Sequence, residues 1–191
     1  MKKRFCILIF IFLFFSCENV DDVQLIMEIE STINYSLPYQ QIEGEIIKIL
    51  TQLNNISMKN LQKWEMGYNQ QLYIYQKLFA YDKISKNDFI NKSKDIYDLW
   101  LDNNPNDTKR LFSLSILRFY SDEQKIALAH FEKIYDSNHK YDQTNPSVED
   151  VMNYISGLFL NKITKKDFEN SIYNHFFEYT EEDFITLFVG Y

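Results

Sequence analysis

The chain has 191 residues, about the length of one domain. Hydrophobic residues make up 46% and charged residues 25%, so the chain can bury a core and is not a disordered tail. With only 4 Gly and 3 Pro it lacks the turn residues of a sandwich or barrel, which favours helices joined by short polar turns. The net charge of −7 argues against binding by phosphate neutralisation, and we expect no nucleic-acid partner.

The N-terminus has the pattern of an export leader. Three basic residues at 2–4 precede an unbroken apolar run at 5–15, and Ser16 and Cys17 follow it. As a helix this run would extend about 16 Å, roughly half the thickness of the bilayer hydrocarbon. It is therefore too short for a permanent transmembrane helix and has the length of a signal sequence.

The end of this run resembles a bacterial lipobox, in which a small residue precedes a Cys that is lipidated and becomes the new N-terminus. The segment Phe14-Phe15-Ser16-Cys17 departs from the strict family pattern at Phe14 and Phe15. The resemblance implies a signal peptide at 1–16 and a covalent diacylglycerol and N-acyl lipid on Cys17. The alternative is an uncleaved leader, or one that merely ends in a Cys.

Lipidation would account for membrane attachment without help from charge. Loss of the leader removes three of the 20 basic residues and none of the 27 acidic ones, so the net charge changes from −7 to −10. Anionic lipid would repel such a body, and the attachment would depend on the lipid anchor. We expect residues 17–20 to form the lipidated Cys and a short tether, and residues 21–191 to form a single all-α domain. Cys6 leaves with the leader, so no intramolecular disulfide is expected.

A repeated capping signal predicts where helices begin. Ser or Thr followed three residues later by Asp, Asn or Gln can accept a hydrogen bond from the third residue of a helix. The signal occurs at Ser57, Ser85, Ser121, Ser147, Thr164 and Thr180. Apolar residues then recur with helical spacing, and no segment of comparable length alternates with period two. The expected helices are 21–36, 40–54, 58–82, 86–102, 107–120, 122–137, 148–161, 165–178 and 181–188.

Two internal similarities indicate a repeat. Residues 83–91 and 162–170 are identical at six of nine positions. A frame of about 34 residues places Ser115, Ala127 and Phe131 where tetratricopeptide repeats keep small, small and aromatic residues. The chain therefore resembles a short tetratricopeptide-like array of stacked antiparallel helical hairpins, and an irregular helical bundle is the alternative.

In tetratricopeptide repeats the first helix of each hairpin lines a concave groove. The resemblance implies that the following residues face a protein ligand: Lys109, Phe112, Ser113, Ile116 and Phe119. The alternative is that Phe112 and Phe119 pack against neighbouring hairpins. A further candidate is Tyr73, which lies off the apolar stripe of its helix and, if exposed, would suit a binding face.

The short motifs of common active sites do not occur in the chain. It contains no HExxH, no Walker loop and no GxGxxG. His175 and Glu178 have a spacing that could share a metal ion, but we favour a solvated side-chain contact. We therefore expect no enzyme, no metal or other cofactor besides the lipid, and no small-molecule substrate.

These observations predict a lipid-anchored, extracytoplasmic helical-repeat protein that acts as a protein–protein interaction scaffold in the bacterial cell envelope. The alternative is a surface-exposed lipoprotein, built as a plain helical bundle, that binds external ligands or host proteins. Only residues 18–20 separate Cys17 from the first expected helix. Such a short tether keeps the body near its membrane and favours the periplasmic face over the cell surface.

Overall fold

The computed structural model describes residue 44, residues 65–80 and residues 82–189. Within these residues all regular secondary structure is helical and no strand occurs, which confirms the all-α prediction. The chain divides into two compact units, Met1–Lys77 and Leu78–Tyr191, and each is considered by itself. The capping signal at Ser57 and nearly all of the two helices expected before it lie outside the described residues.

The described part of the first unit is mainly residues 65–77 of α4 (Glu65–Ala80), a helix that lies within the one expected at 58–82. Tyr68, Leu72 and Ile74 are buried on this helix. Tyr73 is half-buried, and the Lys77 ammonium lies 5.3 Å from the centre of its ring. At that distance the cation is attracted to the face of the ring. Part of the Tyr73 ring is thus already engaged within its own unit.

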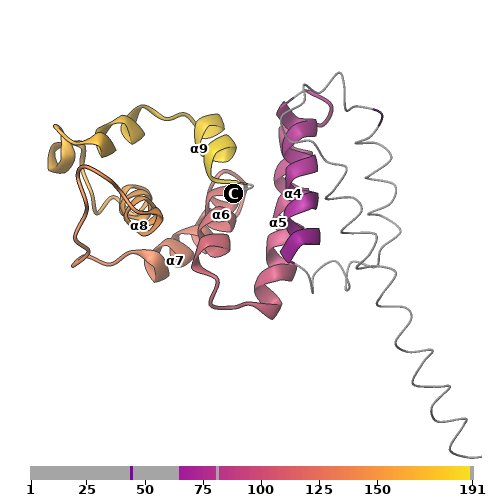
Figure 1. Ribbon diagram of the computed structural model, residues 1–191, viewed down its shortest axis with the longest axis horizontal. Coiled ribbons are helices and arrows are strands. Elements are labelled where there is room, and N and C mark those ends of the chain that lie inside the picture. Colours follow the sequence, from indigo (N-terminus) through magenta and orange to yellow (C-terminus); the bar gives the residue numbers. More distant parts are fainter. Residues whose placement is uncertain (1–43, 45–64, 81, 190–191) are drawn as a thin grey trace, which may run out of the picture. The chain divides into compact units, whose positions relative to one another are not determined.

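The second unit contains the remaining helices, which follow one another closely along the chain (Figure 1). In order they are α5 (Lys86–Asn103), α6 (Thr108–Phe119), α7 (Gln124–Ile134), α8 (Val148–Phe159), the 3-10 segments η1 (Lys165–Phe168) and η2 (Ile172–Glu178), and α9 (Glu181–Phe188). Helix α6 packs against both α5 and α7, α7 packs against α8, and α9 returns to contact α6. The C-terminal helix therefore lies against the middle of the unit.

Aromatic rings fill the interior that these helices share. Phe131 of α7 and Phe159 of α8 stack with their centroids 4.8 Å apart. Phe112 of α6 meets Phe131 edge-on at 6.2 Å, and Phe184 of α9 lies 5.2 Å from Phe159. Each such side chain buries roughly 150–250 Å². One continuous aromatic core therefore connects four helices from different parts of the sequence.

Three of the predicted capping signals start α-helices. Before α8, the Ser147 amide donates to Asp150 Oδ2 at 2.7 Å and the Asp150 amide donates to Ser147 Oγ at 3.1 Å. The same reciprocal pair joins Thr180 and Asp183 before α9, at 2.7 and 3.2 Å. Ser85 Oγ accepts from the third residue of α5 at 3.1 Å. These bonds satisfy amides that a helix start otherwise leaves without partners.

Two expectations about helix starts and extents are wrong. Helix α7 begins at Gln124 without a side-chain cap, because the Ser121 hydroxyl instead donates to a carbonyl in the last turn of α6 at 3.1 Å. The helix expected at 165–178 is two 3-10 segments, η1 and η2. Ser171 divides it, since its Oγ accepts from the Tyr173 amide at 3.2 Å and so starts a second cap.

The two similar segments, 83–91 and 162–170, share the turn that precedes them. Each follows a helix, and two residues after the end of that helix lies a residue with a φ of 55°, Asp82 in one case and Asn161 in the other. In both, the next residue is a Lys whose amide donates to the carbonyl five residues earlier at 2.8 Å. This is the hydrogen bond of a Schellman motif. The internal similarity therefore includes one way of ending a helix, whereas the elements that follow differ.

Candidate functional site

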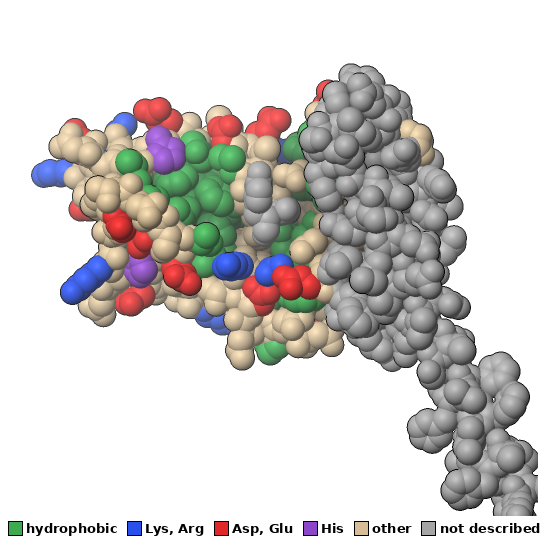
Figure 2. All heavy atoms as spheres, viewed as in Figure 1, with side chains coloured by type: hydrophobic (Ala, Val, Ile, Leu, Met, Phe, Trp, Pro, Cys, Tyr) green, Lys and Arg blue, Asp and Glu red, His purple; other side chains and the backbone are tan. Residues whose placement is uncertain are grey.

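A groove on the second unit lies between the first half of α6, the start of α8 and the end of α9. Its volume is about 420 Å³, within the range of ligand-binding sites. The lining is mostly apolar, and its members are Phe112, Pro146, Val148, Val151, Met152, Leu187 and Phe188, with Lys109, Ser113 and Ser147 as the polar ones. In the view of Figure 2, hydrophobic side chains gather over the region of α8 and α9, with charged side chains around them.

The groove has a buried floor and an exposed apolar rim. On the floor, Phe112 and Met152 are only 3% and 5% exposed. On the rim, Val148 is 57% exposed and Leu187 is 42% exposed. The described residues include four large hydrophobic side chains with this degree of exposure, and two of them stand at this groove. Clustered exposed apolar side chains beside a hollow are typical of an interaction site, whereas scattered ones are ordinary.

Helix α6 holds the end of α9 in place. The Ser113 hydroxyl donates to the backbone carbonyl of Phe188 at 2.6 Å, across 75 residues of sequence. The ring of Phe112 meets the ring of Phe188 edge-on, with centroids 5.7 Å apart. A polar and an apolar contact thus act on the same residue of α9. Together they give the groove a preformed wall.

The start of α8 is held by a buried carboxylate. Asp150 Oδ2 accepts from the Ser147 amide, and Asp150 Oδ1 lies 2.7 Å from Nε2 of His139. Burial by itself raises the pKa of Asp150, but the hydrogen bonds from Ser147 and His139 outweigh it, so the pKa lies below its ordinary value of 3.8. Asp150 is therefore charged at neutral pH. Its bonds fix Ser147 and Val148 at the edge of the groove.

Lys109 is the one charged side chain among the residues that line the groove. It is exposed on the first turn of α6, and no described residue forms an ion pair with it. The groove therefore presents a mostly apolar surface with one unpaired positive charge at its edge. Such a surface would favour an apolar partner that carries a negative charge at one end.

The structure brings three of the sequence-predicted residues together at this groove, namely Lys109, Phe112 and Ser113. Ile116 is fully buried further along α6 and does not line it. Phe119 packs in the aromatic core, where its ring centroid lies 4.4 Å from that of a phenylalanine of α8. Phe119 thus packs as the alternative interpretation expected, and Phe112 both packs against Phe188 and lines the groove.

Other predicted residues lie elsewhere, and some lining residues were missed. Tyr73 belongs to the first unit, and Cys17 lies outside the described residues. Val148, Leu187 and Phe188 were not among the predicted site residues. The sequence does contain an indication of these residues. Helix α9 has more apolar side chains than one buried stripe requires, and Val148 is an apolar residue one turn before Met152.

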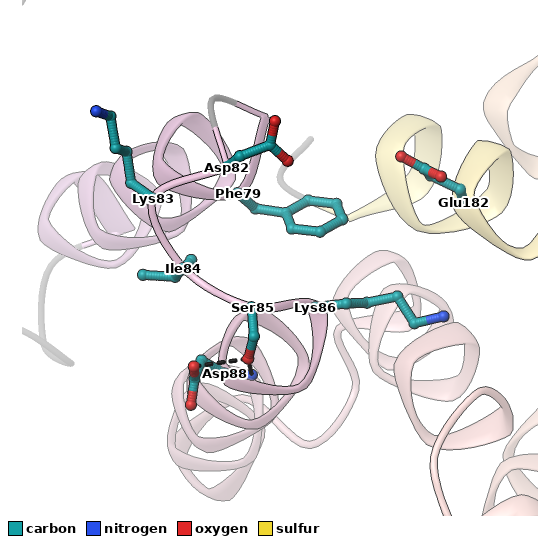
Figure 3. Close-up of a pocket in the computed structure, with 8 residues that line it drawn as sticks. All are labelled: Phe79, Asp82, Lys83, Ile84, Ser85, Lys86, Asp88 and Glu182. Carbon is teal, nitrogen blue, oxygen red and sulfur yellow. Dashed lines mark hydrogen bonds between the residues drawn. The ribbon is translucent and has the colours of Figure 1, made fainter.

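A second hollow, of about 600 Å³, lies between the turn after α4 and the start of α9 (Figure 3). The ring of Phe79 and the carboxylate of Glu182 point toward one another across it. Three of its other polar side chains already serve the fold: Ser85 and Asp88 cap α5, and Lys86 forms an ion pair with the first residue of α9 at 2.7 Å. We therefore assign no ligand to this hollow.

In the part of the chain that the structure describes, no three His, Cys, Asp or Glu side chains come together as a metal site requires. The same part holds no helix with both the length and the apolar character to cross a bilayer. No family model, curated protein or solved structure matches the chain. The groove of α6, α8 and α9 is the candidate functional site among the described residues.

Proposed function

We propose that this chain is a lipid-anchored, extracytoplasmic protein of the bacterial cell envelope that acts as a protein–protein interaction scaffold, and that the groove of α6, α8 and α9 is its docking surface. The observation that supports docking is the rim, where Val148 and Leu187 expose large apolar surfaces beside a buried aromatic floor. Burial of apolar area by a partner would gain about 25 cal/mol per Å² before the costs of association.

The groove favours binding over chemistry. Its lining contains one Lys and two Ser as polar side chains. Ser113 already donates to a backbone carbonyl and Ser147 accepts from the Asp150 amide, so neither is paired with a general base. Accordingly we propose no enzymatic activity, metal or cofactor for the groove.

The anchor belongs to the same proposal. Cys17 would carry the lipid, and the signal peptide at 1–16 would direct export. In a membrane fractionation experiment, Cys17→Ala should release the protein into the soluble fraction. Cys6→Ala is the matched control, since it removes a thiol from the leader and should leave attachment unchanged. Attachment of the Cys17→Ala variant at the wild-type level would contradict the anchor.

The finer architecture is also proposed. We propose that α6 and α7 form one tetratricopeptide-like hairpin, as the small residues Ser115 and Ala127, both fully buried, and the packing of consecutive helices support. A crystal structure of the full chain would test this. Antiparallel hairpins stacked in one sense would support the array, and splayed helices would leave the irregular bundle.

Photo-crosslinking in living cells tests the docking surface. A photoreactive amino acid would replace Val148 or Leu187 on the rim and, as the control, the exposed Ile126 of α7, which does not line the groove. We expect one crosslinked protein at both rim positions and none at the control. The same products at all three positions, or none at the rim, would contradict docking in the groove.

Digestion by protease in intact and permeabilised cells decides between the two compartments. Protection until permeabilisation would support the periplasmic scaffold. Digestion in intact cells would support the alternative, a surface-exposed lipoprotein that binds external ligands or host proteins, and the irregular path of η1 and η2 is compatible with its plain helical bundle.

A further inference from the structure

We infer that the occupant of the groove is an amphipathic helical segment of a partner protein, with apolar anchors on one face and an acidic side chain beside them. This inference rests on the proposed function, because it names the chemistry of the partner that the groove would take. Lys109 is the one charged residue in the lining, and no described residue neutralises it.

The exposure of the rim argues for a segment with a solvated outer face. A buried acyl chain or small molecule has 70–90% or more of its surface enclosed by its site. Here Val148 is 57% exposed and Leu187 42% exposed, so both lie along an open edge and do not close over the hollow. An amphipathic helix needs such an edge, because it buries only its apolar face and leaves the other in water.

The more exposed lining residues provide the contact surface for the anchor side chains. Val148 and Leu187 are exposed, and Val151 and Phe188 are half-buried. Phe188 is held at the end of α9 by the Ser113 hydroxyl, so this surface is preformed. Anchors spaced three or four residues apart on a helix would contact these apolar side chains together.

The position of Lys109 then selects the charge of the partner. It lies at the α6 side of the groove, three residues before Phe112, and is exposed to solvent. An acidic residue next to the anchors would pair with it, whereas a basic residue would be repelled. The whole chain carries a net charge of −7, so this preference is local and opposes the overall charge.

Three synthetic peptides test the inference. They share one length and one apolar face of leucine and phenylalanine, and their polar faces carry Glu, Gln or Lys. Binding to the full chain in phosphatidylcholine nanodiscs is followed by fluorescence anisotropy, with empty nanodiscs as the blank. We expect the Glu peptide to bind roughly two to five times more tightly than the Gln peptide, as an exposed ion pair allows, and the Lys peptide to bind most weakly.

Two charge variants supply the matched comparison. Lys109→Glu should reverse the order of the three peptides. Lys125→Glu makes the same charge change on an exposed residue of α7 outside the groove, and should keep the wild-type order. The double variant Val148→Ser, Leu187→Ser should weaken all three peptides, and since both side chains are exposed it should remain folded.

The outcomes separate the inference from the proposed function. Equal binding of the three peptides, or an unchanged order in Lys109→Glu, would overturn the acidic partner but leave the docking surface. Saturable binding of laurate that depends on Lys109, with no peptide binding, would overturn the helical segment in favour of an amphiphile. Absence of binding by every probe, together with no crosslink at the rim, would overturn both.

Discussion

The substitution Gly157→Ala is expected to destabilise the protein, although Ala is ordinarily preferred to Gly inside a helix. A Cβ at this position in α8 would lie 2.5 Å from Ile163 Cδ1 and 2.8 Å from Tyr135 Cε2. Non-bonded carbon atoms are normally about 3.5–4.0 Å apart, so both neighbours would have to move. The Ile163 side chain has little room to move, because Ile163 is only 8% exposed.

The expected change follows from two opposing effects. Replacing Gly by Ala in a helix stabilises by about 0.5–1 kcal/mol. Overpacking of a filled core costs about 1–3 kcal/mol. We therefore expect the free energy of unfolding to fall by about 1–2 kcal/mol. Gly44→Ala is the control, since nothing lies within 4 Å of a Cβ there, and it should leave stability unchanged or slightly higher.

Urea unfolding of the full chain, followed by near-ultraviolet circular dichroism, measures the effect through the buried aromatic rings. The double variant Gly157→Ala, Ile163→Val removes the nearest atom, so its loss should be smaller than the sum of the two single losses. A Gly157→Ala variant as stable as the wild type, or losses that simply add, would refute the steric argument.

Three other predictions concern buried polar groups and helix ends. Tyr154→Phe should raise the free energy of unfolding by about 1 kcal/mol, because the buried Tyr154 hydroxyl has no hydrogen-bond partner among the described residues. Tyr173→Phe should lower it by a similar amount, because the Tyr173 hydroxyl donates to a carbonyl at 2.7 Å. Chemical denaturation of both variants would show changes of opposite sign. The lowered pKa of Asp150 contributes stability that is present above its ordinary pKa of 3.8 and is lost as the pH falls through the pKa of the folded state. The Asp150→Asn variant should therefore be less stable than the wild type at pH 7, and in an acid titration its free energy of unfolding should fall less steeply. Asn161→Gly should stabilise the protein by up to about 1 kcal/mol and so raise the melting temperature, because Asn161 has a φ of 55° that glycine adopts without steric cost. An unchanged melting temperature would contradict this assignment of the helix end.

The ends of helices were predictable where local hydrogen bonds decide them. The reciprocal pair of Ser147 and Asp150 requires only four consecutive residues, and the same holds for Thr180 and Asp183. Ser121 has the same local pattern but does not cap α7. Its hydroxyl finds a carbonyl at the end of α6 instead, which is a choice between two nearby partners that the pattern alone does not rank.

The two similar segments show where local reasoning stops. In both, the hydroxyl of Ser85 or Thr164 donates to the carboxylate three residues later, yet 83–91 enters an α-helix and 162–170 enters a 3-10 turn. Ile90 is buried in the first, whereas the corresponding Glu169 is exposed and adds nothing to the core. Ser171 then competes for backbone hydrogen bonds and ends the segment. Burial by the rest of the fold therefore contributes to whether such a start continues as an α-helix.

The groove could not be predicted from local sequence patterns, because its three walls come from residues far apart in the sequence. The resemblance to a repeat selected Lys109, Phe112 and Ser113 on α6, and the structure brings all three to the groove. The opposite wall depends on the Ser113 hydroxyl reaching Phe188 across 75 residues, a contact with no local pattern. What the sequence does contain is an excess of apolar residues on short helices such as α9. A helix that exposes Leu187 after its buried stripe is complete has apolar surface available for a partner, and this excess is the feature to look for first in similar chains.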